Sequence, residues 1–356
     1  MGWRSAVLGL GGLVWGAVAA AEEPVEAAVP QETVEAAVPR EPVEAAVPRE
    51  PAALAAGGFE GLAPEALLDE AVLRIRLGDF AGADARLAAL MARAPSAAVR
   101  YHRARSAEFQ GRPEAALDDY AAVEGDPAAG ALAADAGFRR ALCLGDLGRH
   151  GEAVAVLDGV AAGAGLSAAD RVTLDITRAT SALLAAEGRK AEKAAAALEA
   201  RLGAADAADA GAWVRGRAWI GLAEAALRAA AGVEMTNGRK ARKRLEARAG
   251  WMGAAEQHIL AAVRTGEPEH ALRGLLLLGD GYVALHGALH GAPPPKRLDA
   301  AGEEVFRAAL AGQTAVLLQK AWRFYDEGVQ LALRVQWQGP PAAALRERRD
   351  GRGLGG

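Results

Sequence analysis

The chain has 356 residues and a formal net charge of −4 at pH 7. This charge gives neither the basic field that nucleic-acid binding requires nor an acidic tail. Apolar residues make up 52% of the chain and aromatic residues only 5%, with Ala and Leu supplying most of the apolar count. Because Ala and Leu are strong helix formers, whereas strands favour β-branched and aromatic residues, the composition predicts an all-helical protein.

Residues 1–21 have the layout of a secretory signal peptide. Arg4 lies in a short n-region, and an apolar stretch follows from Ala6 to Ala20. This stretch is short for a membrane span of about 20 residues. Ala19 and Ala21 then have Ala-x-Ala spacing ahead of Glu22. We expect an exported protein whose mature chain starts near Glu22, with an uncleaved N-terminal anchor as the alternative.

A tandem nonapeptide fills much of residues 22–58. The motif Val-Glu-Ala-Ala-Val-Pro begins at Val25, Val34 and Val43. The recurring Pro blocks a continuous helix, and the segment has too little apolar area to offset the entropy of ordering. We expect a disordered, mildly acidic tether. A replication-slippage expansion without a selected role is the alternative.

Three glycines mark a repeated spacing of side chains. One Ala lies seven residues before each of Gly78, Gly111 and Gly148, and another lies five residues after it. A large side chain follows four positions later, and a medium apolar one three positions beyond that. Small residues at matching heights let two successive helices approach closely, and a glycine turn joins them into an antiparallel hairpin. Such hairpins cannot bury their apolar faces alone, so copies stack. The matching sets are Ala71, Ala83, Leu87 and Leu90; Ala104, Ala116, Tyr120 and Val123; and Ala141, Ala153, Leu157 and Val160.

This pattern resembles the tetratricopeptide repeat, a helix-turn-helix unit of about 34 residues. A fourth, degenerate unit around Gly188 has Ser181 before the turn and Ala194 and Leu198 after it. The resemblance implies a tetratricopeptide-like helical-hairpin solenoid over residues 59–205. It also implies that first-helix side chains line a concave binding face: Tyr101, Arg105 and Glu108 in the second unit, and Phe138, Leu142 and Asp146 in the third.

Two alternatives apply to this face. Phe138 and Leu142 are also the residue types expected to pack against a neighbouring hairpin. Members of the family that clamp a peptide carboxylate use Lys and Asn, and these repeats contain no Asn. The resemblance therefore favours an extended or helical segment of another envelope protein as the partner.

Longer helices are expected over residues 206–338. One helix ends near Gly232, a second runs from Arg239 to Arg264, and a third begins at Glu267-Pro268 and contains four consecutive Leu residues. The last, from Leu298 to about Trp337, is either one long helix or two helices broken near Gly312.

The last of these helices resembles the closing helices of envelope repeat proteins from gliding Gram-negative bacteria. The matching residues are Lys320-Ala321-Trp322, Tyr325 and Leu331-Ala332. After this helix, the Arg- and Gly-rich residues 339–356 are expected to form a disordered tail.

Few residues suggest chemistry. His286 and His290 share a helix face at the spacing of a two-His metal pair, but no third ligand is evident nearby. His258 and His270 are expected to be exposed, and Cys143 to be a small buried residue. The sequence contains no phosphate-binding loop and no Gly-x-Ser-x-Gly elbow. We therefore expect no enzyme activity, no metal site and no cofactor.

These features together predict a periplasmic protein of a Gram-negative envelope, acting as a non-catalytic scaffold or adaptor for protein partners in a cell-envelope assembly. Membrane association would be peripheral at most. One alternative is a peptidoglycan- or lipid-surface binder that uses the basic run from Arg239 to Arg244, although such a run is more often the solvated face of a helix. The other is a metal-binding or enzymatic protein built around His286 and His290.

Overall fold

The computed structural model describes residue 59 and residues 61–163, 165–236, 240–295 and 298–351. Within these ranges the chain forms 13 α-helices and no strand, which confirms the predicted all-α class. None of these helices is long and apolar enough to cross a membrane. The predicted signal peptide (1–21) and the predicted tether (22–58) lie outside the described residues.

The chain divides into two compact units at Ala185 and Ala186. The described part of the N-terminal unit holds α3 to α9, and that of the C-terminal unit holds α10 to α15. The sequence had placed the change in helix organisation later, between residues 205 and 206. The degenerate fourth repeat is divided accordingly, since Ser181 lies in α9 and both Ala194 and Leu198 lie in α10.

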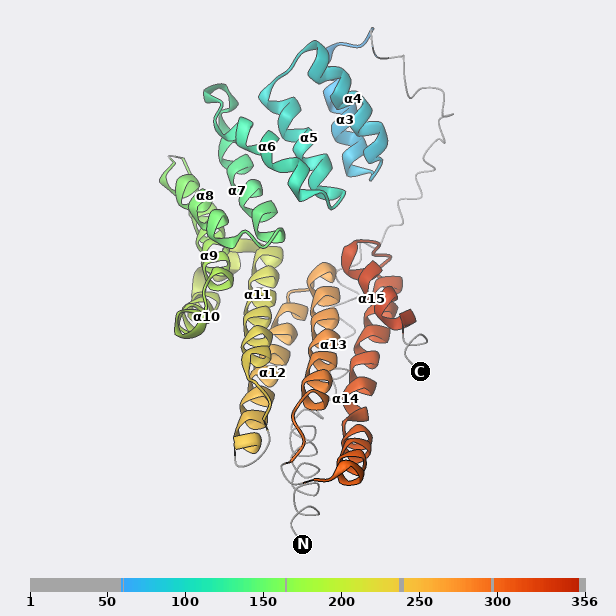
Figure 1. Cartoon of the computed structure of the whole chain (residues 1–356). Helices are drawn as coiled ribbons and strands as arrows, with labels where there is room; N and C mark the ends of the chain where they lie inside the picture. Colours follow the sequence, from blue (N-terminus) through green and yellow to red (C-terminus); the bar gives the residue numbers. More distant parts are fainter. Residues whose placement is uncertain (1–58, 60, 164, 237–239, 296–297, 352–356) are drawn as a thin grey trace. The chain divides into compact units, whose positions relative to one another are not determined.

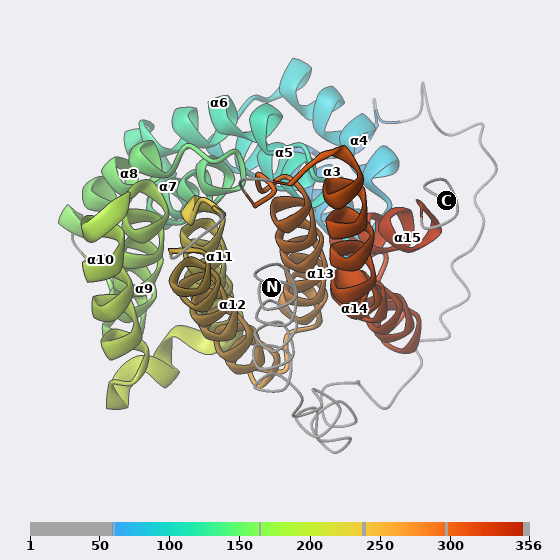
Figure 2. The same cartoon turned by 60° about the horizontal axis from the view of Figure 1, so that its bottom comes forward.

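The N-terminal unit is a series of helical hairpins that follow one another in chain order (Figures 1 and 2). The three inter-helix glycines Gly78, Gly111 and Gly148 have φ angles of 75°, 69° and 73°. Residues with a side chain rarely adopt this left-handed backbone, so the glycines are required by the turns. The pairs are α3 (Pro64–Arg76) with α4 (Phe80–Arg93), α5 (Ala97–Phe109) with α6 (Pro113–Glu124), and α7 (Ala131–Asp146) with α8 (His150–Ala162), after which α9 (Ala168–Ala185) follows.

The repeated small residues lie where the paired helices meet. Ala104 on α5 and Ala116 on α6 have no exposed surface, and neither does Tyr120, one turn beyond Ala116. The equivalent residues of the other two hairpins are at most 2% exposed: Ala71, Ala83, Leu87, Ala141, Ala153 and Leu157. The predicted hairpin spacing is therefore confirmed.

Replacing Ala116 by Leu is expected to destabilise the N-terminal unit by roughly 1 to 3 kcal/mol, because extra methylene groups cannot enter a filled helix contact. The measurement is thermal unfolding followed by far-UV circular dichroism. Ala122→Leu is the matched control, since Ala122 lies on the same helix but is exposed. An unchanged melting temperature for Ala116→Leu would contradict the packing of α5 on α6.

The C-terminal unit contains the predicted longer helices, which lie side by side around one apolar core (Figure 1). The last long helix is continuous through Gly312, which confirms the first of the two alternatives, one long helix. The run of four Leu residues lies on the preceding helix. Neighbouring helices bury Leu275 and Leu278 and partly cover Leu276 and Leu277, as this run predicted. The helices are α10 (Gly188–Leu202), α11 (Gly211–Gly232), α12 (Ala241–Val263), α13 (Pro268–His290), α14 (Ala300–Arg334) and α15 (Pro340–Asp350).

Helix α15 corrects the predicted disordered tail, of which residues 340–350 are helical. The Arg-rich composition suggested disorder, but two apolar side chains of α15, Ala342 and Leu345, are fully buried. Leu345 lies so close to Gly328 on α14 that a Cβ there would be 2.6 Å from its methyl carbon. Arg348 adds an ion pair to Asp280 on α13, with an N–O distance of 2.9 Å. Tight packing on a glycine therefore holds this short helix.

Candidate partner-binding surface

Helix α5 carries three of the six predicted partner-binding residues. Ser96 caps its start by accepting a hydrogen bond from the Val99 amide at 3.3 Å. Tyr101, Arg105 and Glu108 follow at helical spacing, so their side chains leave the same side of the helix. The three side chains differ in their burial and in their polar partners.

Tyr101 is a core residue. It is only 5% exposed, and its ring meets the ring of Tyr120 edge to face at a centroid distance of 6.0 Å. Its hydroxyl donates a hydrogen bond to Asp135 and accepts one from Arg139 at 3.1 Å. Burial, followed by the bond to Asp135, raises the pKa of the Tyr101 phenol. Truncating Tyr101 would therefore damage the fold, which makes this residue unsuitable as a probe of binding.

Glu108 is committed to an internal polar cluster. It accepts a hydrogen bond from the Tyr120 hydroxyl at 2.5 Å and pairs with the Arg139 guanidinium at 3.3 Å. The Glu108 and Arg139 side chains are only 17% and 22% exposed. The charges of Glu108, Tyr101 and Asp135 raise the pKa of Arg139 against the opposing effect of burial. The cluster ties α5, α6 and α7 together.

Arg105 differs from both neighbours because no carboxylate pairs with it. Its Nε is buried and has no hydrogen-bond partner. The centre of its guanidinium lies 4.9 Å from the ring centre of Phe109 and 5.9 Å from that of Tyr101, within cation–π range. The Phe109 ring is 48% exposed. Arg105 and Phe109 therefore present a cation and an aromatic ring at the surface of α5.

The remaining three predicted residues lie on α7 and do not form one surface. Leu142 is 6% exposed and belongs to the interior. Phe138 is partly buried against the apolar cluster that contains Leu157 and Leu174, as the packing alternative expected. Asp146 is exposed at the last residue of α7.

Sequence reasoning did not select His102 and Phe109, which lie near Arg105 on α5, or Arg76 on α3, which also acts on His102. His102 is half-buried, and burial, Arg105 and Arg76, in that order, lower its pKa to about 4. The imidazole is therefore neutral at pH 7. The spacing of His102, Arg105 and Phe109 along α5 could have indicated a shared face, but the position of Arg76 on α3 depends on how the hairpins stack.

The two-His pair in the C-terminal unit has adjacent rings. The His286 and His290 ring centroids are 4.3 Å apart. His290 Nε2 lies 2.8 Å from the hydroxyl oxygen of Thr314, whose own hydrogen is donated to the Leu310 carbonyl. His290 therefore donates to Thr314 through Nε2. Among the described residues no cluster of three or more His, Cys, Asp or Glu side chains could hold a metal ion.

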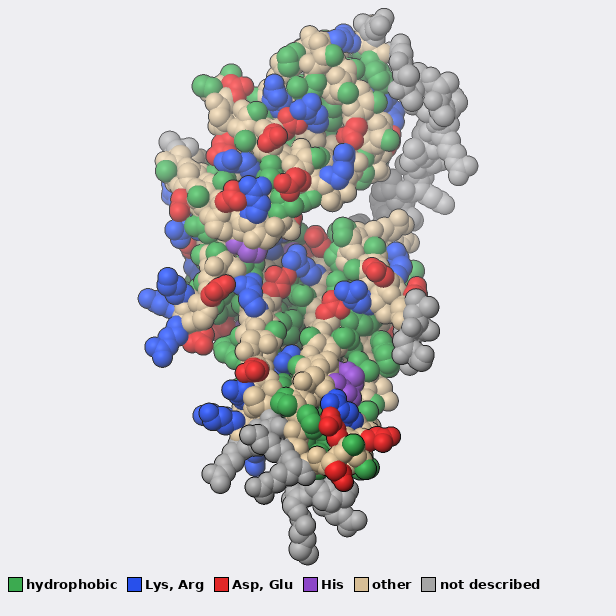
Figure 3. All heavy atoms as spheres, viewed as in Figure 1, with side chains coloured by type: hydrophobic (Ala, Val, Ile, Leu, Met, Phe, Trp, Pro, Cys, Tyr) green, Lys and Arg blue, Asp and Glu red, His purple; other side chains and the backbone are tan. Residues whose placement is uncertain are grey.

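Two of the four described cations of the basic run have carboxylate partners. Arg242 pairs with Glu246 at 2.7 Å, and Arg244 pairs with Glu234 at 3.3 Å. Arg239 lies outside the described residues. Figure 3 likewise shows basic and acidic side chains interspersed on each unit in that view.

Two histidine predictions were wrong. His270 is 2% exposed, and its Nε2 lies 2.9 Å from the Trp213 carbonyl oxygen. His258 stacks on Trp219 and lies 3.3 Å from Glu199, with burial lowering its pKa. Both residues lie within helices, His258 in α12 and His270 in α13, and each ring packs against a Trp of α11. Cys143 is fully buried, as expected.

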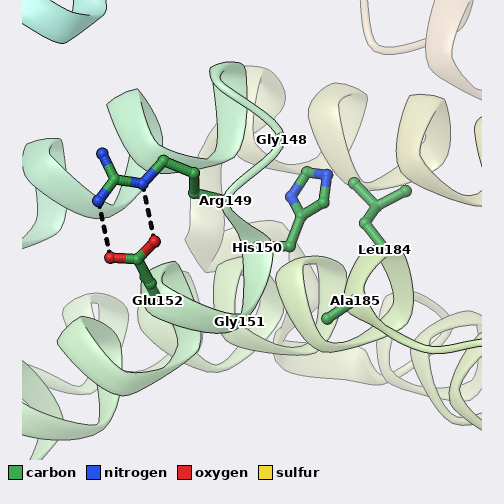
Figure 4. Close-up of a pocket in the computed structure, with 7 residues that line it drawn as sticks. All are labelled: Gly148, Arg149, His150, Gly151, Glu152, Leu184 and Ala185. Carbon is green, nitrogen blue, oxygen red and sulfur yellow. Dashed lines mark hydrogen bonds and ion pairs between the residues drawn. The ribbon is translucent and has the colours of Figure 1, made fainter.

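A shallow pocket lies in the N-terminal unit where α7 turns into α8 (Figure 4). Its lining includes Arg149 and His150 from the turn, and Leu184 from the end of α9. Figure 4 shows the Arg149 guanidinium turned toward Glu152, with which it forms two hydrogen bonds of 2.7 and 2.8 Å. Because its one well-placed cation is already neutralised, this pocket offers less to a ligand than the face around Arg105.

In comparisons with protein-family models, with curated proteins and with solved structures, no match to this chain was found. Its architecture, a stack of sequential helix pairs, is therefore known from the structure alone.

Proposed function

We propose that this protein is an exported, non-catalytic scaffold or adaptor that binds a protein partner in a cell-envelope assembly. Its repeats would be of the tetratricopeptide type, and its location the periplasm of a Gram-negative cell. Export is supported by the signal-peptide layout of residues 1–21. Binding is supported by one observation above all: the exposed Phe109 ring and the Arg105 guanidinium lie together on α5, and Arg105 has a buried Nε without a hydrogen-bond partner.

Aromatic residues and Arg are over-represented at the centres of protein–protein interfaces, where they carry most of the binding energy. Stacked hairpins present such residues on one continuous face, and this face can follow an extended or helical segment of a partner. The same arrangement offers no nucleophile with a base beside it, which favours binding over catalysis as the role of this surface.

The test is crosslinked capture from the envelope fraction of the native host, comparing the wild-type protein with an Arg105→Ala/Phe109→Ala double variant. We expect a specific partner whose recovery falls by about tenfold or more in the double variant, since truncations at interface centres reach that size. Arg171→Ala is the control, because Arg171 is an exposed arginine of α9 in the same unit.

Four outcomes would contradict the proposal or the surface assigned to it. One is equal capture by the wild type and the double variant. Another is capture that disappears only when residues 298–356 are removed. The third is salt-sensitive cosedimentation with peptidoglycan or vesicles, abolished by neutralising Lys240 and Lys243, which would favour the surface-binding alternative. A bound metal that is lost with His286 and His290 would instead favour the metal-site alternative.

A further inference from the structure

The N-terminal unit pairs most of its arginines internally. Within its described residues, ten arginine side chains have a carboxylate or carbonyl partner. Three do not: Arg76, Arg105 and Arg171. Arg171 lies apart on α9, whereas Arg76 and Arg105 both act on the same imidazole, His102. Both guanidinium groups therefore lie near enough to the half-buried His102 ring to lower its pKa, and neither has a carboxylate partner.

In the free protein the positive charge of Arg76 and Arg105 has no carboxylate partner. Like charges repel, and the part of Arg105 that is removed from water has no acceptor to replace it. An anionic group bound between α3 and α5 would supply that acceptor and reduce the repulsion. The exposed Phe109 ring beside Arg105 would at the same time bury an apolar side chain of the ligand.

We propose that Arg76, His102, Arg105 and Phe109 form a docking site for an acidic peptide segment of the partner, which carries two carboxylates and an apolar side chain beside them. This inference rests on the proposed function and names the chemistry of its partner. The four residues are called the α3–α5 site below.

Charge and spacing select a peptide over other anions. The guanidinium groups belong to two neighbouring helices, whose axes lie on the order of 10 Å apart. A peptide in the extended polyproline II conformation has three residues per turn and advances by about 3.1 Å per residue, so side chains three positions apart leave the same face at a similar distance. A single phosphate group would leave the exposed Phe109 ring uncovered. A long nucleic acid would meet only two unpaired cations at this site, on a protein whose net charge is −4.

The test uses the full mature chain and a fluorescein-labelled peptide of sequence Gly-Ser-Glu-Leu-Ser-Glu-Leu-Gly, with binding followed by fluorescence anisotropy. The matched peptide has Gln in place of both Glu residues. We expect the acidic peptide to bind and the Gln peptide to bind at least tenfold more weakly. Arg76→Ala and Arg105→Ala should each weaken the acidic peptide by about tenfold, the size associated with hydrogen bonds to charged groups. Arg171→Ala should leave its affinity unchanged.

A second readout follows the His102 imidazole by NMR. Its pKa of about 4 in the free protein should rise when the acidic peptide saturates the site, because a nearby carboxylate stabilises the imidazolium form. The Gln peptide should leave the titration unchanged. This shift depends on where the peptide binds and would not follow from a change in fold stability. Circular dichroism of each variant checks that the helices remain intact.

The proposal is overturned if the acidic peptide does not bind, if the Gln peptide binds as well, or if a single-stranded oligonucleotide of equal charge binds more tightly to the same residues. If the peptide fails while envelope capture still depends on Arg105 and Phe109, only the assigned partner chemistry is wrong. If neither experiment detects a partner, the proposed function itself is wrong.

Discussion

Replacing Arg139 by Met is expected to destabilise the N-terminal unit by about 3 kcal/mol. Met keeps most of the side-chain volume but removes the cation that faces Glu108 and Asp135. Breaking a largely buried ion pair leaves an uncompensated charge, which costs more than the pair itself contributed. Replacing Glu108 by Gln in the same chain should recover much of the loss, because one buried carboxylate then disappears.

The tryptophans allow this effect to be assigned to one unit. In the described chain they lie in the C-terminal unit, from Trp213 to Trp337, and the N-terminal unit has none. Urea unfolding of Arg139→Met should therefore shift to lower concentration by far-UV circular dichroism, while the Trp fluorescence transition stays in place. Arg178→Ala, which breaks the exposed pair with Asp158, is the control and should change little. An Arg139→Met midpoint equal to that of the control would contradict the role given to the polar cluster.

Replacing Gly279 by Ala is expected to destabilise the C-terminal unit by about 2 kcal/mol. A Cβ at this position of α13 would lie 2.2 Å from the ring of Tyr325 on α14, and that ring is only 2% exposed. The ring cannot move freely, because its hydroxyl donates a hydrogen bond to Asp280 at 2.7 Å. Forcing a methyl group into such a contact costs on the order of 1 to 3 kcal/mol.

Gly312→Ala on α14 is the matched control and should have the opposite sign. Nothing lies within 4 Å of a Cβ at Gly312, and Ala stabilises a helix interior by roughly 0.5 to 1 kcal/mol relative to Gly. Trp fluorescence during urea unfolding measures both variants. A Gly279→Ala protein as stable as the wild type would mean that α13 and α14 do not approach as closely as described.

The sequence predicted the hairpins well because their signal is local. Glycines such as Gly111 and small residues such as Ala116 recur at fixed positions, and each is needed by a turn or a helix contact that its own hairpin forms. The helix of residues 340–350 was missed because it is held by one distant feature, the space left by Gly328. Its own Arg-rich sequence gives no sign of that space.

The candidate site was predictable only in part. Tyr101 and Arg105 are one turn apart. Sequence spacing alone could not show that Asp135 and Arg139, from the next hairpin, would bond the Tyr101 hydroxyl. It also could not show that Arg105 would stay unpaired. Arg76 reaches the same site from the preceding hairpin. Which polar side chains are satisfied is decided by contacts between repeats, and a single sequence does not record those contacts.

The most direct test of the central claim, binding through the face of α3 and α5, is hydrogen–deuterium exchange of the full mature chain with and without its captured partner. We predict that the partner slows exchange in peptides covering residues 68–76 and 98–109 and leaves those of α13 and α14 unchanged. Slower exchange confined to residues 268–334, with α3 and α5 unaffected, would contradict the account and move the binding surface to the C-terminal unit.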